Sequence, residues 1–327
     1  MLKRSSMRFA AGALIALASS LASPPPAMAG APQHHDQVPG FYRLKVGELE
    51  VTSLYDGPAM FQLDWLNDEN GTRQRVESAL HENPHILDVA DTAFLVNTGK
   101  QLVLVDAGSG KWFGGGTLGH LLNSMRNAGY APEQVDRVLI THMHSDHIGG
   151  LTTQDGTRVF PNADVFVAKA ESDYWLSSAN AARAPKEAQQ FFQAAKAISA
   201  PYIKAAKWHT FGASATVMDG VELVSLHGHT PGHTGYEFSS QGQKILFWGD
   251  TVHAQAVQLS DPDITVVFDV DHPTAAQARN QLLQSLAREG ALIAGPHMIF
   301  PGLGRLRKVE TGYVWVPVAY TDQWVER

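Results

Sequence analysis

Short apolar runs, separated by turns and by segments with helical spacing, divide the chain into strands and helices. Residues 41–54 predict two strands with a turn at Gly47-Glu48. The other predicted strands cover residues 93–98, 102–105, 135–140, 163–168, 221–225, 236–239, 244–248 and 291–294, and the predicted helices cover residues 117–128, 171–178, 187–197 and 273–288. Two strand-rich halves with helices outside them indicate an α/β fold, a four-layer αββα sandwich in which loops from both halves meet along one edge.

Three segments do not fit this regular order. The first strand pair is expected to stop at Asp56-Gly57, where Pro58 follows. Residues 59–91 lack a strand period and show a helical pattern only around residues 73–81, so they are predicted to form a long excursion over the surface. The extended segment at residues 313–320 fits pairing at a sheet edge or in a homodimer, and the sequence does not fix the oligomeric state.

Residues 1–29 have the three parts of an export signal. Lys3, Arg4 and Arg8 precede an apolar stretch at residues 9–22, and Ala27-Met28-Ala29 is a small-residue cleavage site. The apolar stretch is shorter than the ~20 residues that a membrane span needs, and no later segment is apolar enough to cross a bilayer. We therefore expect an exported protein, periplasmic or secreted, with a single mature domain at residues 30–327.

Composition narrows what this domain binds. The chain has 327 residues, of which 44% are hydrophobic, enough for a large core. The leader carries three basic and no acidic residues, so its removal moves the formal net charge from −7 to −10. Nucleic acid is therefore not an expected partner, because its phosphates require clustered Lys and Arg. The chain has no cysteine, so a bound metal must be held by nitrogen and oxygen.

The densest group of coordinating side chains follows the predicted strand at residues 135–140. Three imidazoles and a carboxylate stand there within six positions: His142, His144, Asp146 and His147. Neither a core nor a surface loop needs this density, so it predicts a metal site. Three more candidates stand just past other apolar strands: His229, Asp250 and His297. The last two lack a local cluster, and spacing alone leaves their role open.

This series resembles the signature of the metallo-β-lactamase superfamily, which is a His-x-His-x-Asp-His loop followed by a later His, Asp and His. The resemblance implies the four-layer sandwich of that superfamily and a two-metal centre. One ion would be held by His142, His144 and His229, the other by Asp146, His147 and His297, with Asp250 bridging them. Asp106 would be a structural carboxylate beneath the site. Imidazole and carboxylate suit Zn²⁺ best, with Mn²⁺, Co²⁺ or Fe²⁺ as other occupants.

Two such cations, held roughly 3.5 to 4 Å apart, lower the pKa of a bridging water enough to leave hydroxide at neutral pH. That hydroxide is the predicted nucleophile, and no Ser or Cys is needed. An ester oxygen that contacts one ion has its developing negative charge offset. Asp250 and Asp146 are candidates for relaying protons.

Within the superfamily the chain resembles the methyl parathion hydrolase family over nearly all its mature length. The resemblance is carried by residues 95–99, 102–106, 117–119, 128–130, 141–150, 227–234 and 300–304. It implies hydrolysis of the aryl ester bond of organophosphate triesters, with Phe113, Trp175 and Phe191 forming an aromatic leaving-group pocket. The expected substrate is then a small, neutral aryl ester. Plain core packing is the alternative role for these three rings.

Other functions remain open or are disfavoured. A lactonase or aryl carboxyl esterase would use the same metal centre, and a non-catalytic metal-binding protein would use the same ligands. A zinc β-lactamase is less favoured, because Asp250 takes the bridging position and no Cys is available. A glutathione thioesterase is disfavoured by export, a nuclease by the acidic charge, and a redox di-iron protein by His144, where a Glu is expected.

Overall fold

A computed structural model of the chain describes residues 37–68, 71, 74, 86–113 and 116–322. The predicted leader at residues 1–29 lies outside the described residues. The chain divides into two units, residues 1–37 and residues 38–327, and the description below concerns the second unit.

The first sheet has seven strands in the order β1-β2-β4-β5-β6-β7-β8. Their bounds are β1 Phe41–Val46, β2 Leu49–Gln62, β4 Ile86–Asn97, β5 Leu102–Val105, β6 Arg137–Ile140, β7 Asp164–Ala168 and β8 Trp208–Phe211. The strands from β1 to β5 pair antiparallel, whereas β5, β6, β7 and β8 are mutually parallel. A parallel pair needs a crossover, and the segments between these strands supply helices that cover one face of the sheet.

The second sheet has six strands in the order β15-β14-β13-β11-β10-β9. Their bounds are β9 Val221–Ser225, β10 Thr234–Ser240, β11 Gln243–Phe247, β13 Leu292–Ala294, β14 Leu303–Lys308 and β15 Tyr313–Pro317. The sequence left two interpretations open for residues 313–320, pairing at a sheet edge or in a homodimer. In the structure Tyr313–Pro317 forms β15, which pairs with β14 at the edge of this sheet. A small third sheet pairs β3 (Leu66–Asn67) with β12 (Thr265–Val266).

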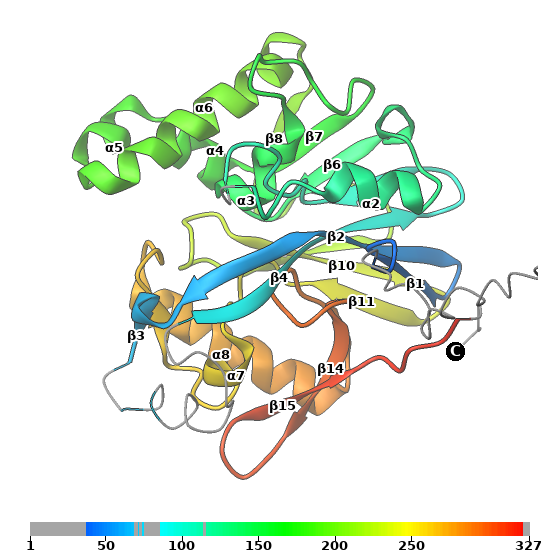
Figure 1. Cartoon of the computed structure of the whole chain (residues 1–327), viewed down its shortest axis with the longest axis vertical. Helices are drawn as coiled ribbons and strands as arrows, with labels where there is room; N and C mark the ends of the chain where they lie inside the picture. The colour runs from blue at the N-terminus through cyan, green and yellow to red at the C-terminus, as the bar shows by residue number, and fades with distance from the viewer. Residues whose placement is uncertain (1–36, 69–70, 72–73, 75–85, 114–115, 323–327) are drawn as a thin grey trace, which may run out of the picture. The chain divides into compact units, whose positions relative to one another are not determined.

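Helices cover the outer face of each large sheet (Figure 1). The first sheet carries α2 (Leu121–Asn127), α3 (Ser145–Ile148), α4 (Lys169–Trp175), α5 (Ser178–Arg183) and α6 (Gln189–Lys204), and the second carries α7 (Gln255–Gln258) and α8 (His272–Glu289). Short 3-10 turns are η1 (Leu63–Trp65), η2 (Pro132–Gln134), η3 (Gly149–Leu151) and η4 (Lys186–Ala188).

Three apolar cores separate these layers. One lies between the first sheet and its helices and includes Leu104, Ile140 and Ile198. A second joins the two sheets face to face and takes residues from both, such as Val103 and Phe247. The third lies beneath α8. The predicted four-layer αββα sandwich is therefore confirmed. Among the residues that the structure describes, no helix combines the length and the apolar composition that a membrane crossing requires.

The pairing of β1 with β2 ends at Leu54, just before Asp56-Gly57 as predicted, but the strand β2 does not stop there. β2 continues to Gln62 and stays paired with β4, with a register shift between Tyr55 and Gly57. Gly57 has φ +145°, and a Cβ there would meet the carbonyl oxygen of Thr117 at 2.1 Å, so glycine permits the bulge. Pro58 lies beyond the β1 partner residues, where β2 is an edge and a missing N–H is tolerated.

The predicted surface excursion at residues 59–91 is consequently wrong at both ends, because residues 59–62 and 86–91 belong to β2 and β4. The helical pattern expected around residues 73–81 falls largely outside the described residues. The predicted helix at residues 117–128 begins later, at Leu121, because Gly119 adopts φ +90°.

Candidate metal centre

Asp106 and several candidate ligands stand at the ends of strands that point in the same direction within each sheet. Asp106 follows β5, and His142 follows the neighbouring parallel strand β6. Asp250 and His297 follow β11 and β13, which are also a parallel pair. His229 follows β9, two antiparallel pairings away from β11 and so in the same direction. Strand direction in both sheets therefore brings these side chains to one edge of the sandwich.

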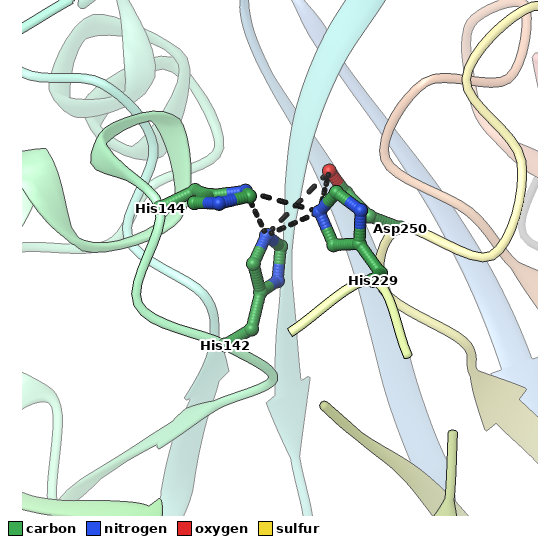
Figure 2. A group of neighbouring side chains, drawn as sticks. All are labelled: His142, His144, His229 and Asp250. Carbon is green, nitrogen blue, oxygen red and sulfur yellow. Dashed lines mark hydrogen bonds and ion pairs between the residues drawn. The ribbon is translucent and has the colours of Figure 1, made fainter. Parts of the chain in front are cut away.

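The first group of candidate ligands is His142, His144, His229 and Asp250. Figure 2 shows their nitrogen and oxygen atoms pointing toward one another. His229 Nε2 lies 3.2 Å from His142 Nε2 and 3.0 Å from His144 Nδ1. Asp250 Oδ2 lies 3.6 Å from His142 Nε2 and 3.4 Å from His229 Nε2. Four ligand atoms thus surround one point.

The second group is Asp146, His147, Asp250 and His297. Asp250 Oδ1 lies 3.0 Å from His147 Nε2 and 3.2 Å from His297 Nε2. Asp146 Oδ2 lies 3.7 Å from His147 Nε2 and 3.8 Å from His297 Nε2. Asp250 belongs to both groups and offers a different oxygen to each.

The spacing and the chemistry of these atoms fit divalent metal ions. Ligand bonds of 2.0–2.1 Å in a tetrahedron place neighbouring ligand atoms ~3.3 Å apart, close to the separations in the first group. His147 Nε2 and Asp250 Oδ1 are buried and have no hydrogen-bond partner, although they face each other. Unpaired buried polar atoms are costly unless something else satisfies them. A metal ion would satisfy both.

The far nitrogen of most candidate imidazoles is fixed by a hydrogen bond. His147 Nδ1 donates to Asp106 Oδ2 at 2.9 Å, His229 Nδ1 to Asp269 Oδ1 at 2.7 Å, and His297 Nδ1 to the carbonyl oxygen of Ala90 at 3.2 Å. Each bond directs Nε2 into the site. These supports orient the rings before a metal arrives.

Asp106, for which the family resemblance implies a structural role, holds the histidine loop through hydrogen bonds. Besides His147, it accepts hydrogen bonds from the backbone N–H and the hydroxyl of Thr141, both at 2.8 Å. The Thr141 oxygen in turn lies 3.1 Å from His142 Nδ1. One buried carboxylate therefore sets the positions of two candidate ligands.

Burial and charge divide the histidines into two kinds. Burial, together with neighbouring imidazoles, holds the pKa of His142 and His144 well below the ordinary value, so these rings are neutral and ready to bind metal. Burial opposes protonation of His147, His229 and His297 as well, but the neighbouring carboxylates, Asp250 foremost, outweigh it. They hold the pKa of His147 well above its ordinary value and raise the pKa of His229 and of His297 to about 9. The same histidines hold the pKa of Asp250 well below its usual range, against the effect of burial. Metal binding must therefore displace protons from His147, His229 and His297.

His233 supports Asp250 from the backbone side. Burial lowers the pKa of His233 to about 3, so its ring is neutral. Its Nδ1 lies 3.1 Å from the carbonyl oxygen of Leu226, and its Nε2 accepts the backbone N–H of Asp250 at 3.0 Å. His253 lies on the carboxylate side, with Nε2 3.0 Å from Asp250 Oδ2.

Aromatic rings lie beside His144. His144 contacts Trp175 edge-on at 5.2 Å and lies 6.4 Å from Phe191, so two of the three predicted pocket residues lie beside a candidate ligand. Phe113 is the exception: its side chain is 39% exposed, and among the described residues no ring contact joins it to the site histidines. Trp175 also belongs to the core between the first sheet and its helices, and Phe191 packs against that core, in keeping with the alternative role of core packing.

A second aromatic cluster lies close to the site. It consists of Phe61, Trp65 and Phe268, which pack edge to face at 5.4 to 6.2 Å. Phe268 lies 5.2 Å from His253 and 6.1 Å from His229. These rings come from the segments at residues 59–91 and 253–270, which contain no recognisable motif.

Sequence reasoning also missed Asp269, which lies 40 positions after the histidine that it contacts. Its carboxylate accepts from His229 Nδ1 and from the backbone N–H of Val266, and it lies 3.9 Å from the guanidinium of the buried Arg279. Burial opposes its ionisation, but the bond to His229 prevails and lowers its pKa below the ordinary value.

Asp269→Asn is expected to weaken metal binding at the first group by 10–100-fold, the usual loss when the partner of a ligating histidine is removed. The amide has no charge to favour the proton on His229 Nδ1. Competition with a coloured chelator measures the affinity. Asp271→Asn, which changes an exposed helix cap, is the control, and equal affinities in the two variants would contradict the role of Asp269.

Comparison with known proteins places these observations in a family. The model of the metallo-beta-lactamase superfamily matches residues 88–297. The solved structure of AbOPH, a hydrolase in the beta lactamase superfamily, is similar with a TM-score of 0.83 and 34% identity, covering 88% of this chain and 100% of that one. The structure of AidC, a dizinc quorum-quenching lactonase, has a TM-score of 0.80 and 28% identity with the same coverage.

A more distant relative is the atrochrysone carboxyl ACP thioesterase of Passalora fulva. It is 25% identical over 202 residues, which cover 60% of this chain and 48% of the thioesterase. The chain thus matches about half the length of that enzyme.

Proposed function

Because this chain belongs to the metallo-beta-lactamase superfamily and is a metal-dependent hydrolase of that fold, we propose that it uses two divalent ions to hydrolyse small, neutral aryl esters, with lactones as the preferred class. The observation that carries the two-ion proposal is the sharing of Asp250 by two groups of candidate ligands, one oxygen to each. Zn²⁺ is the proposed metal, in keeping with the nitrogen and oxygen donors.

The seven candidate ligands form two groups, one for each proposed ion. In this proposal His142, His144 and His229 hold one ion, Asp146, His147 and His297 hold the other, and Asp250 contacts both. When bound, such a pair lowers the pKa of a coordinated water and polarises an ester oxygen. No Ser or Cys nucleophile is then required.

Two carboxylates are placed to move protons. Asp250 lies between the two groups and is buried, whereas the side chain of Asp146 is 20% exposed. We assign Asp250 the role of accepting a proton inside the site and Asp146 the role of exchanging it with solvent. His253 Nε2, in contact with Asp250 Oδ2, keeps that carboxylate oriented.

The aromatic rings set the proposed substrate class. The rings of Trp175, Phe191 and Phe268 lie 5.2 to 6.4 Å from the ring of His144. Such faces bind a flat, uncharged ring through apolar contact and offer nothing to a charged phosphate. Lactones are the preferred class because AidC, similar over most of the chain, is a lactonase.

Organophosphate triesters are the second candidate. They are neutral, carry an aryl leaving group and fit the same aromatic surroundings, and the motif segments of the chain resemble the methyl parathion hydrolase family. The aromatic rings alone do not separate a lactone from a triester, because both substrates present an apolar ring next to an ester bond.

A three-substrate panel tests the proposal. The kcat/KM values of the zinc-loaded enzyme are compared for dihydrocoumarin, an N-acyl homoserine lactone and methyl parathion. We expect dihydrocoumarin to be turned over at least tenfold better than methyl parathion. The reverse order would select the second candidate, and absence of turnover for all three would reject an ester hydrolase of this type.

A further inference from the structure

Glu171 is a fully buried carboxylate in the first turn of α4, and the mechanism above does not use it. Its Oε2 accepts the backbone N–H of Met143 and the indole N–H of Trp175, both at 2.9 Å. Its Oε1 accepts the backbone N–H of Gly232 at 2.7 Å. All three contacts are donors, so each oxygen of Glu171 acts as an acceptor.

The three donors come from three different parts of the candidate site. Met143 stands between His142 and His144, so a bond to its N–H fixes the loop that carries both ligands. Gly232 belongs to the loop that begins with His229. Trp175 contacts the ring of His144 edge-on at 5.2 Å. Glu171 therefore links the His142–His144 loop, the His229 loop and the Trp175 ring through its hydrogen bonds.

Tight packing around Glu171 means that a small shift of its carboxylate would affect both ligand loops. A Cβ added to Gly232 would lie 2.7 Å from the backbone nitrogen of Glu171 and 3.0 Å from its Cγ. The His229 loop therefore lies directly against the start of α4, with no room for a side chain. A shift of the Glu171 carboxylate would move this loop relative to the histidine loop, and ligand atoms only 3.0 to 3.2 Å apart tolerate little movement.

We propose that Glu171 is a positioning residue. It holds the His142–His144 loop and the His229 loop at the separation that the first metal ion requires, and its hydrogen bond to the Trp175 indole fixes that ring relative to the two loops. The proposal rests on the metal-dependent function proposed above. Glu171 does not itself touch the ion or the substrate, so its effect is on how well the three histidines are prearranged.

Glu171→Gln tests this role, because the amide nitrogen must turn toward one of the three donors and lose that bond. Zinc affinity of the holoenzyme is measured by competition with a coloured chelator, and Co²⁺ absorption reports the ligand geometry. We expect the affinity of the first group to fall by 10–100-fold, the Co²⁺ spectrum to change and tryptophan fluorescence to shift.

Asp56→Asn is the matched control. Asp56 is also fully buried and accepts three backbone N–H groups, from Ser109, Gly119 and Leu121, at 2.8 to 3.0 Å. Its loss should destabilise the fold to a similar degree while leaving zinc affinity and the Co²⁺ spectrum of the first group unchanged. A merely structural role for Glu171 would make the two variants behave alike.

The outcomes separate this proposal from the proposed function. If the wild-type protein binds no metal, the proposed function fails. If the wild type binds two ions and Glu171→Gln binds them within twofold as tightly, with an unchanged Co²⁺ spectrum, only the role of Glu171 is overturned. Should Glu171→Gln not fold, Glu171→Asp carries the test, because it is one methylene shorter and must give up at least one donor. We expect about tenfold weaker binding, and unchanged affinity would overturn the proposal.

Discussion

Replacement of Asp250 by alanine is expected to lower kcat/KM by ~10³-fold or more. Loss of a single charge-stabilising group at a reacting centre commonly costs ~10²–10³ in rate, and Asp250 contacts both groups of candidate ligands. The variant also leaves five histidines, four of them candidate ligands, without the carboxylate that lies 3.0 to 3.6 Å from each of them. The measurement is the steady-state hydrolysis of dihydrocoumarin at saturating zinc, with metal content determined on the same sample.

The control for this prediction is a carboxylate of the same type that lies outside the site. Asp173 pairs with Lys169 on the surface and its side chain is 62% exposed, so Asp173→Ala should retain full turnover. Circular dichroism establishes that the Asp250 variant is folded. A folded Asp250→Ala enzyme with more than a tenth of the wild-type rate would contradict the shared role of this carboxylate.

Removal of metal with a chelator is expected to abolish hydrolysis and to lower Tm by on the order of 10 °C. A site filled at 1,000 times its dissociation constant stabilises the folded state by ~4 kcal/mol, and each kcal/mol shifts the Tm of a domain of this size by a few degrees. Without ions, buried atoms such as His147 Nε2 and Asp250 Oδ1 remain unpaired. Differential scanning calorimetry and an ester assay follow the two effects.

Adding metal back to the apo-protein distinguishes a metal-dependent enzyme from a protein that only binds metal. Zn²⁺, and to different extents Mn²⁺ or Co²⁺, should restore both the rate and the Tm. Mg²⁺, which prefers oxygen ligands in an octahedron, is the control and should restore neither. Recovery of Tm without recovery of hydrolysis would favour a non-catalytic metal-binding protein.

Local sequence patterns predicted most of the fold. The hairpin at Gly99-Lys100 and the helix α8 follow from turn residues and apolar spacing that lie within a few positions of one another. The continuation of β2 beyond Asp56 could not be predicted from local patterns, because its bulge at Gly57 depends on contact with Thr117, 60 positions later. The pairing of β3 with β12 is even less local, since it joins residues about 200 positions apart.

The same distinction holds for the site. The histidine loop was recognisable because four coordinating groups stand close together in the sequence, and the structure brings the more distant His229, Asp250 and His297 to them. Asp269 and Glu171 gave no signal, because an isolated acidic residue is ordinary in any sequence. Their contacts arise only when α4 and the segment before α8 pack against the ligand loops.

The most direct test of the account is the metal content of active enzyme, measured by elemental analysis while apo-protein is titrated with Zn²⁺. Hydrolysis should rise with bound metal and reach its plateau at two ions per chain, and Asp250→Ala should bind fewer ions at the same free zinc concentration. Full activity in a preparation that holds no metal, or a plateau at one ion per chain, would contradict a centre in which Asp250 joins two ions.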